Sequence, residues 1–234
     1  MKPLISVIIP TYDEEKYLES TIRSIKNQCY DGKYEIIVSD GGSKDGTLKI
    51  AKKYRIKTVV NGRGISLGRN AGAEASKGGI LLFIDADTII MPNLLSEFER
   101  SFRNKNVVGV TCSIMPSKMD VTNLSHYLAY NSITNLGVKT IYPRVAGTCV
   151  AYRRNEFFEI GGFDEKINAL EDLDISQRIS KLGKIIFNEN TLAVTSARRI
   201  ERYGNFKFLG KLAKLYLKLL TKQKIEIKEY RPVR

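Results

Sequence analysis

The chain has 234 residues, 43% of them hydrophobic and 27% charged, which is enough for one α/β core with a small appendage. Its formal net charge of +13 favours anionic partners such as nucleic acid, phosphorylated substrates or an anionic bilayer surface. Cys29, Cys112 and Cys149 follow no metal-ligand spacing, so we expect reduced core thiols in a cytosolic protein and exclude a disulfide scaffold.

Neither a leader peptide nor a membrane span is expected. Met1-Lys2-Pro3 runs directly into a strand-length apolar segment, which leaves no room for a secretory signal. The longest uncharged stretch, 121–138, carries too many polar side chains to span a bilayer.

The first half of the chain alternates short apolar runs with helical spacing, which predicts consecutive βαβ units. Strands are expected at 4–9, 34–39, 58–60 and 80–84, with helices at 18–27, around Ile50 and Tyr54, and from Arg69 onward.

The second half is less regular, and the segment 121–138 stays open. Strands are expected at 107–115 and 147–153, edge strands at 185–187 and 192–194, and a helix at 172–182. Because no linker or repeat interrupts the chain, we predict one α/β domain over residues 1–205, with a Rossmann-like, mostly parallel sheet covered by helices on both faces.

Two carboxylates follow the most apolar predicted strand. Ile80–Ile84 is short, uncharged and branched, as buried parallel strands are, and Asp85 and Asp87 stand at its carboxyl end, where open α/β sheets bind ligands. Carboxylate oxygens suit Mg²⁺ or Mn²⁺, whose remaining positions are filled by water and substrate phosphates. The alternative is that Asp85 caps a turn and Asp87 is merely solvated.

The turns after the first two strands should reach the same edge of the sheet. The turn that begins at Pro10, Thr11 and Tyr12, together with Asp40, can line a nucleotide pocket. Asp40 accepts from a base N–H, Tyr12 faces a base or ribose, and a carboxylate of Asp13, Glu14 or Glu15 accepts from ribose hydroxyls. The alternatives are acids at a helix amino-terminus, favoured for Glu15, and an ordinary turn at Asp40.

Six motifs in this order resemble glycosyltransferase family 2, an inverting family with the GT-A fold that uses nucleotide-diphospho-sugar donors. They are Pro10-Thr-Tyr-Asp-Glu-Glu15, Val38-Ser-Asp-Gly-Gly-Ser-Lys-Asp-Gly-Thr47, Gly68-Arg-Asn-Ala-Gly72, Phe83-Ile-Asp-Ala-Asp87, Gly161-Gly-Phe-Asp164, and Glu171-Asp-Leu-Asp174 with Arg178. The resemblance implies that Asp40 reads the base, Arg69 lies near the nucleotide or diphosphate, Asp85 contacts ribose or sugar, and Asp87 binds the metal.

The resemblance also implies that Asp172 is the general base, which withdraws the proton of an acceptor hydroxyl. Glu171 and Asp174 are then candidate acceptor contacts or acids of the first helical turn, and the second interpretation is favoured for Asp174. Arg178 is expected either to pair with one of these acids or to contact phosphate.

The chain departs from the family pattern at two positions. Many relatives have a late histidine as a further metal or diphosphate ligand, but the one histidine here, His126, lies in the open middle segment. Arg198 and Arg199 follow the last predicted strand, and their guanidinium donors suit a diphosphate leaving group. Gly41 replaces a second Asp, which leaves Asp40 alone to read the base.

Residues 206–234 are predicted to form a basic amphipathic helix and tail. Lys207, Lys211, Lys214, Lys218 and Lys222 form one stripe opposite apolar side chains. Such a helix suits an anionic membrane surface, and the alternative is a helix packed on the domain with a solvated lysine face.

The sequence thus predicts a metal-dependent inverting enzyme that moves sugar from a UDP- or GDP-sugar to a sugar, glycan or lipid acceptor. Its expected location is the cytoplasm, with peripheral contact to the inner face of the cell membrane. The alternatives are a sugar-phosphate nucleotidyltransferase, disfavoured by the acidic turn after the first strand, and a nucleic-acid-binding protein, for which no motif is visible.

Overall fold

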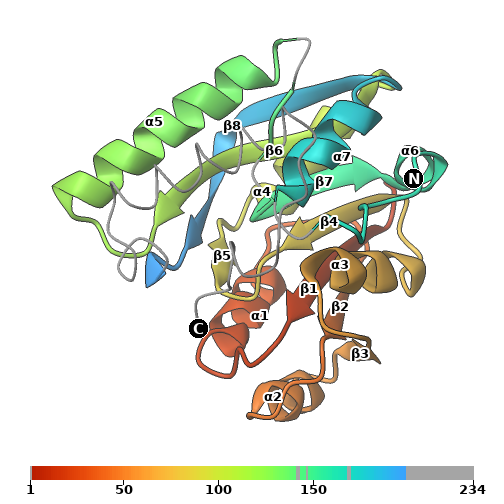
Figure 1. Ribbon diagram of the computed structural model, residues 1–234, viewed down its shortest axis with the longest axis vertical. Helices are drawn as coiled ribbons and strands as arrows, with labels where there is room; N and C mark the ends of the chain where they lie inside the picture. Colours follow the sequence, from red (N-terminus) through yellow and green to blue (C-terminus); the bar gives the residue numbers. More distant parts are fainter. Residues whose placement is uncertain (1, 141–142, 146, 168–169, 199–234) are drawn as a thin grey trace.

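The computed structural model describes residues 2–140, 143–145, 147–167 and 170–198, which form one eight-stranded sheet in the order β3-β2-β1-β4-β7-β6-β8-β5 (Figure 1). The strands are β1 (Ile5–Thr11), β2 (Tyr34–Asp40), β3 (Lys57–Val60), β4 (Ile80–Ile84), β5 (Thr88–Ile90), β6 (Val107–Pro116), β7 (Cys149–Arg153) and β8 (Lys184–Thr195). The helices are α1 (Leu18–Lys26), α2 (Thr47–Lys53), α3 (Ile65–Glu74), α4 (Leu94–Phe102), α5 (Val121–Gly137), α6 (Arg154–Glu159) and α7 (Glu171–Ile179).

The sheet has a parallel half and a mixed half. β3, β2, β1 and β4 run parallel, as expected for successive βαβ units. β7 then lies antiparallel between β4 and β6, β8 runs parallel to β6, and β5 closes the edge antiparallel to β8. Because β7 is reversed, its first residue Cys149 lies beside Ile84, at the carboxyl end of β4.

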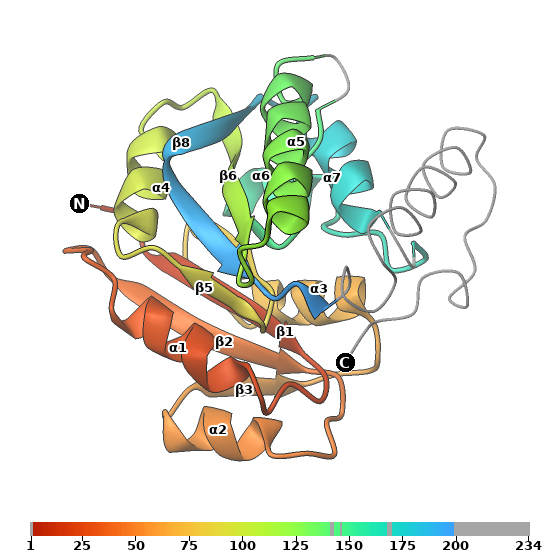
Figure 2. The ribbon, with the colours of Figure 1, turned by 90° about the vertical axis from the view of Figure 1, so that its left-hand side faces the viewer.

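Both faces of the sheet are buried, which confirms the prediction of helices on each side. Val7 and Ile9 of β1 point into a core shared with α1, α4 and α5, whereas Ile8 points into a core shared with α3, α6 and α7. This alternation along β1 is the two-residue period of a strand. Figure 2 shows α5 lying along β6 and β8.

Several sequence expectations are wrong in detail. The α3 helix begins at Ile65, so Gly68 and Arg69 lie inside it. The two predicted edge strands are one strand, β8, which lies inside the sheet between β6 and β5. No element was predicted for β5 and α4, and Cys29 is exposed while the other two thiols are buried.

The open segment forms the α5 helix, which explains its unusual polarity. Asn131 is buried and uses its side-chain amide to pair with both the N–H and the C=O of Ile114 in β6. The side chain thereby satisfies backbone groups that a further strand would otherwise bond.

Among the described residues, none of the helices combines the length and the hydrophobicity that a membrane span needs. The predicted helix after Phe206 and its membrane contact lie outside the described residues and stay predictions, which cosedimentation of the full chain with anionic liposomes would test.

Gly72 lets α3, the helix that carries Arg69, approach the sheet closely. A Cβ at residue 72 would lie 2.4 Å from Cγ2 of Ile8, whereas a Cβ at Gly68 would lie 3.4 Å from Cβ of Pro10, an ordinary contact. We therefore expect Gly72→Ala to lower the free energy of unfolding by about 1 to 3 kcal/mol through overpacking. Gly68→Ala, on the same helix, should stay within about 1 kcal/mol of wild type because alanine favours a helix. Urea denaturation would compare them, and equal losses would contradict this account of Gly72.

Candidate active site

The site lies where the strand order reverses, between β1 and β4. β2 and β3 lie on one side of β1, and β4 lies on the other, so the carboxyl ends of β1 and β4 meet at a topological switch point, the position at which open α/β sheets bind ligands. The turn after β1 contains Glu14, and the turn after β4 contains Asp85 and Asp87. The structure thus brings the predicted acidic turns to one rim.

Asp40 closes β2 and is fully buried. One of its oxygens accepts from the backbone N–H groups of Gly42 (2.9 Å) and Ser43 (2.8 Å). The other accepts from the hydroxyls of Thr11 (2.9 Å) and Ser43 (2.6 Å). A carboxylate has about four acceptor positions, so a base N–H would have to replace or share one of these donors.

The Tyr12 ring has a partner that the sequence did not indicate. The guanidinium of Arg63 lies over this ring, 4.4 Å from its centre, and a Cβ at Gly41 would lie 3.4 Å from its Cδ2 atom. A side chain at residue 41 would therefore contact the Tyr12 ring, and glycine leaves that part of the ring uncovered. Arg63 stands in a glycine-rich loop before α3, where no local pattern indicates stacking.

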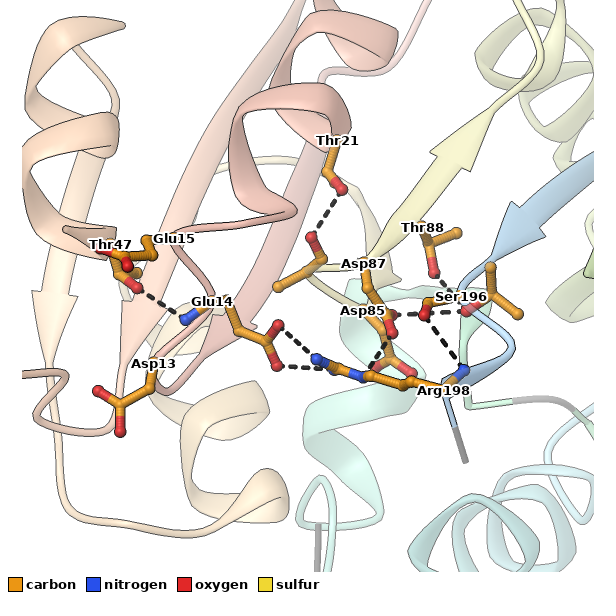
Figure 3. Close-up of polar contacts among 12 residues, drawn as sticks. Asp13, Glu14, Glu15, Thr21, Thr47, Asp85, Asp87, Thr88, Ser196 and Arg198 are labelled. Atoms are coloured by element: carbon orange, nitrogen blue, oxygen red, sulfur yellow. Dashed lines mark hydrogen bonds and ion pairs between the residues drawn. The ribbon is translucent and has the colours of Figure 1, made fainter. Parts of the chain in front are cut away.

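Of the three acids after β1, Glu14 alone points toward Asp87 in the close-up (Figure 3). Asp13 accepts from the N–H of Lys44 (2.7 Å), and Glu15 accepts from the N–H of Gly46 (2.6 Å). These bonds fasten the turn after β1 to the turn before α2. Glu15 thus supports a loop instead of the amino-terminus of α1, which begins at Leu18.

Arg198 connects the two acidic turns. Its Nη1 and Nη2 atoms donate to both oxygens of Glu14, at 2.8 and 2.7 Å, and its Nε atom lies 3.0 Å from Oδ2 of Asp87. Oδ1 of Asp87 accepts from the hydroxyl of Thr195 at 3.4 Å, and the ring of Tyr17 lies 5.1 Å from the guanidinium carbon. The predicted diphosphate residue therefore lies at the rim, whereas Arg199 is outside the described residues.

Arg69 is buried at the centre of the site, with 2% of its side chain exposed. Nη1 donates to Glu171 (2.8 Å), and Nη2 donates to Asp85 (3.1 Å) and to the carbonyl of Gly147 (2.9 Å). Burial by itself lowers the pKa of this guanidinium, but the charges of Asp85, Glu171 and Asp172 hold it above its usual value. Arg69 thus joins Asp85, which follows β4, to the acids of α7.

Asp172 is half-buried beside this cation. Its Oδ2 accepts from the N–H of Gly147 at 3.1 Å, and its Oδ1 accepts from the N–H of Leu173 at 2.9 Å. Burial, followed by the charge of Glu171, raises the pKa of Asp172 to about 6, against the opposing effect of Arg69. A carboxyl with this pKa is ionised at neutral pH and is more basic than an ordinary aspartate.

Gly147 was missed as a site residue. Its N–H binds Asp172 while its carbonyl binds Arg69, and a Cβ there would lie 3.1 Å from Nη2 of Arg69 and 3.2 Å from the Asp172 carboxylate. The sequence placed this glycine in a strand and gave no sign of its contacts.

The other two charged residues of α7, Asp174 and Arg178, pair with each other and not with Arg69 or Asp172. Asp174 pairs with Arg178 through Nε at 2.8 Å, and Arg178 also donates to the carbonyl of Ile160 at 2.9 Å. Of the two expectations for Arg178, pairing with an acid is the one that the structure shows.

The rim acids fit a divalent cation that keeps substrate and water ligands. Within the described residues, no group of three or more His, Cys, Asp or Glu side chains is placed to hold a metal. Asp87, with Asp85 beside it, offers hard carboxylate oxygens, and one or two such ligands are what Mg²⁺ or Mn²⁺ usually takes when phosphates supply the rest. His126 lies on α5 and is not in such a group.

Solved structures share this fold. Mannosyltransferase PcManGT from Pyrobaculum calidifontis, in complex with GDP-Man and Mn²⁺, aligns with a TM-score of 0.70 and 22% identity over 92% of this chain and 65% of its own. TarS 1-349 from S. aureus, in complex with UDP-GlcNAc, aligns with a TM-score of 0.63 and 22% identity over 82% of this chain and 58% of its own. The mixed sheet with acidic turns at its switch point is the GT-A class of α/β fold.

Sequence comparison then gives the family. The profile described as "Glycosyl transferase family 2" matches residues 6–161, and the chain belongs to this family. Glycosyltransferase AglE of Haloferax volcanii is 28% identical over 211 residues, which are 84% of this chain and 68% of that protein. The uncharacterized glycosyltransferase YfnE of Bacillus subtilis is 31% identical over 115 residues, 47% of this chain and 29% of that protein. The match therefore covers about two thirds of the length of AglE and less than a third of the length of YfnE.

The contacts of Arg69 predict a large stability effect. Arg69→Met should lower the free energy of unfolding by about 3 kcal/mol, because it leaves the partly buried carboxylates of Asp85 and Glu171 without their cation. Arg178→Met removes a more exposed pair within one helix and should cost about 1 kcal/mol or less. Chemical denaturation of both variants would test this. A stable Arg69→Met protein that has lost only nucleotide binding would instead make Arg69 a direct donor ligand.

Proposed function

We propose that this domain transfers a sugar, with inversion, from a nucleotide-diphospho-sugar to an acceptor hydroxyl, with Asp172 as the general base. The observation that carries the proposal is the position of Asp172, an ionisable carboxylate with a raised pKa held beside Asp85 through Arg69 and Gly147. A base next to the donor-side rim is what direct displacement at a sugar carbon requires.

The donor side is proposed to consist of the end of β1 with Pro10 and Thr11, the following turn with Tyr12 and Glu14, and Asp85. Support comes from the GDP-Man and UDP-GlcNAc present in complexes of PcManGT and TarS. The four donors already on Asp40 support a role for this residue in holding its turn, and base recognition by its carboxylate stays a prediction. Arg69 is proposed to position the acids around it.

Asp87 is the proposed metal ligand. PcManGT was solved in complex with Mn²⁺, which supports the use of a divalent cation by this domain. When bound, such a cation would neutralise the charge that develops on the diphosphate leaving group. Glu171, which is tied to Arg69, borders the acceptor side, and the acceptor is proposed to be a sugar, glycan or lipid hydroxyl.

The two alternative functions have less support. A sugar-phosphate nucleotidyltransferase is expected to have a basic phosphate loop after its first strand, whereas the turn after β1 contains Asp13, Glu14 and Glu15. A nucleic-acid binder would not need an acid of raised pKa beside a buried arginine.

Replacing the base should separate binding from transfer. Asp172→Asn should bind donor as wild type does and lose transfer to a hydroxyl acceptor by about two to four orders of magnitude. Asp174→Asn, which removes a neighbouring acid of the same helix, is the control and should stay near wild type. Transfer at a wild-type rate in Asp172→Asn would assign the base to another residue.

The same variant tests the pH dependence. Since the base must be ionised, wild-type transfer should fall as pH drops through about 6, the pKa of Asp172. The residual activity of Asp172→Asn should lack this step. Initial rates across the pH range would show whether the step belongs to Asp172.

Asp87→Ala should abolish Mn²⁺-dependent nucleotide binding while the fold remains intact, because this carboxylate lies at the rim and outside both hydrophobic cores. Asp31→Ala is the matched control, since Asp31 is an exposed acid distant from the rim. Isothermal titration with UDP or GDP and Mn²⁺ would measure both. Unchanged affinity in Asp87→Ala would remove this residue from the metal site.

A further inference from the structure

The guanidinium of Arg198 lies between two carboxylates, Glu14 and Asp87 (Figure 3). It forms a bidentate pair with Glu14 and a single contact with Asp87 through Nε, all at 2.7 to 3.0 Å. Charge-assisted pairs of this geometry are the strong ones among protein hydrogen bonds. A cation of the protein itself thus lies against the proposed metal ligand.

The three side chains are shielded from solvent, so the contact is not a loose surface pair. Arg198 is 19% exposed, Glu14 11% and Asp87 9%. The ring of Tyr17 is 5.1 Å from the guanidinium carbon. Two acids and an aromatic ring therefore form a site that holds one cation, and screening by salt is weak in such surroundings.

A guanidinium and a divalent cation would compete for Asp87. Its Oδ2 atom already lies against Arg198, and its Oδ1 accepts from Thr195. Two cations within contact distance of each other repel strongly where water is largely excluded. Binding of a metal at Asp87 therefore requires Arg198 to leave that carboxylate.

We propose that Arg198 holds the place of the divalent cation at Asp87 in the donor-free protein and exchanges with it when the metal and a nucleoside diphosphate bind together. The freed guanidinium then pairs with the diphosphate, whose negatively charged oxygens replace the carboxylates that Arg198 has left. This inference rests on the proposed metal site and adds a role for Glu14, which is to hold Arg198 beside Asp87.

The exchange predicts effects of opposite sign at one residue. Arg198 lowers the affinity for metal alone, because metal must first displace it, and raises the affinity for the metal-bound diphosphate, because it gains a partner there. If the guanidinium occupies the site about 70 to 90% of the time, it reduces the apparent metal affinity roughly three- to tenfold.

Isothermal titration of the full chain tests both signs. Arg198→Gln should bind Mn²⁺ alone roughly three- to tenfold more tightly than wild type, and should bind UDP or GDP with Mn²⁺ about tenfold or more weakly, as expected for the loss of a charge-assisted bond. Arg198→Lys keeps the positive charge but lacks the bidentate guanidinium. Its affinities in both titrations should lie between those of wild type and Arg198→Gln. Arg178→Gln, an equivalent change on α7, should match wild type in both titrations.

A fluorescence measurement keeps the wild-type Arg198 in place. The chain has no tryptophan, so Tyr17→Trp provides a single indole beside the guanidinium, whose emission can be excited selectively over that of the tyrosines. Mg²⁺ is used because it does not itself quench indole emission. Adding Mg²⁺ together with a nucleoside diphosphate should change the emission of the introduced indole, because Arg198 moves away from it. The change should be absent when Arg198→Gln is combined with Tyr17→Trp.

Each contrary result has a distinct meaning. Unchanged or weaker Mn²⁺ binding by Arg198→Gln would overturn the exchange while leaving the proposed metal site intact. Absence of Mn²⁺ binding by wild type, with and without nucleotide, would overturn the metal site and the exchange together. A fluorescence response that persists without Arg198 would show that the emission reports another change and would count against the exchange.

Discussion

The buried guanidinium of Arg69 is the interaction on which the site depends. It bonds Asp85 at the end of β4, Glu171 at the start of α7 and the carbonyl before β7, so three separate parts of the chain meet at one side chain. Without this cation, the acids would repel one another in surroundings that solvate charge poorly. The parallel half of the sheet and the mixed half are therefore joined electrostatically as well as by β4–β7 pairing.

The first half of the fold and its rim could be predicted because their signals are local. A strand buried on both faces reads as a short apolar run, and Asp85 and Asp87 stand directly after one. Parallel strands place such ends together, so the acidic turns could be assigned to one edge. The mixed half lacks this regularity: the polar residues Asn188–Asn190 interrupt the apolar pattern of β8, and α5 buries Asn131 to satisfy a strand.

Contacts between distant residues could not be predicted. Arg69 meets its acids 16 and 102 positions away, and nothing near Arg69 in the sequence indicates that it is buried. The role of Gly147 depends on the space between two side chains from different helices. A motif resemblance can suggest which residues matter, but only the packing shows that Arg69 faces carboxylates, and that Glu14, unlike its two neighbours, faces Arg198.

The pair between Glu14 and Arg198 also bears on how the domain folds. It joins residues 184 positions apart, and the entropic cost of closing a loop grows with its length. One ion pair is too weak to close such a loop alone, so this contact depends on the pairing of β8 with β6, which brings the chain before Arg198 back to the rim. During synthesis the acids of the rim emerge long before Arg198 does. All four strands of the parallel half are therefore synthesised before Arg198, the residue that pairs with Glu14 and Asp87.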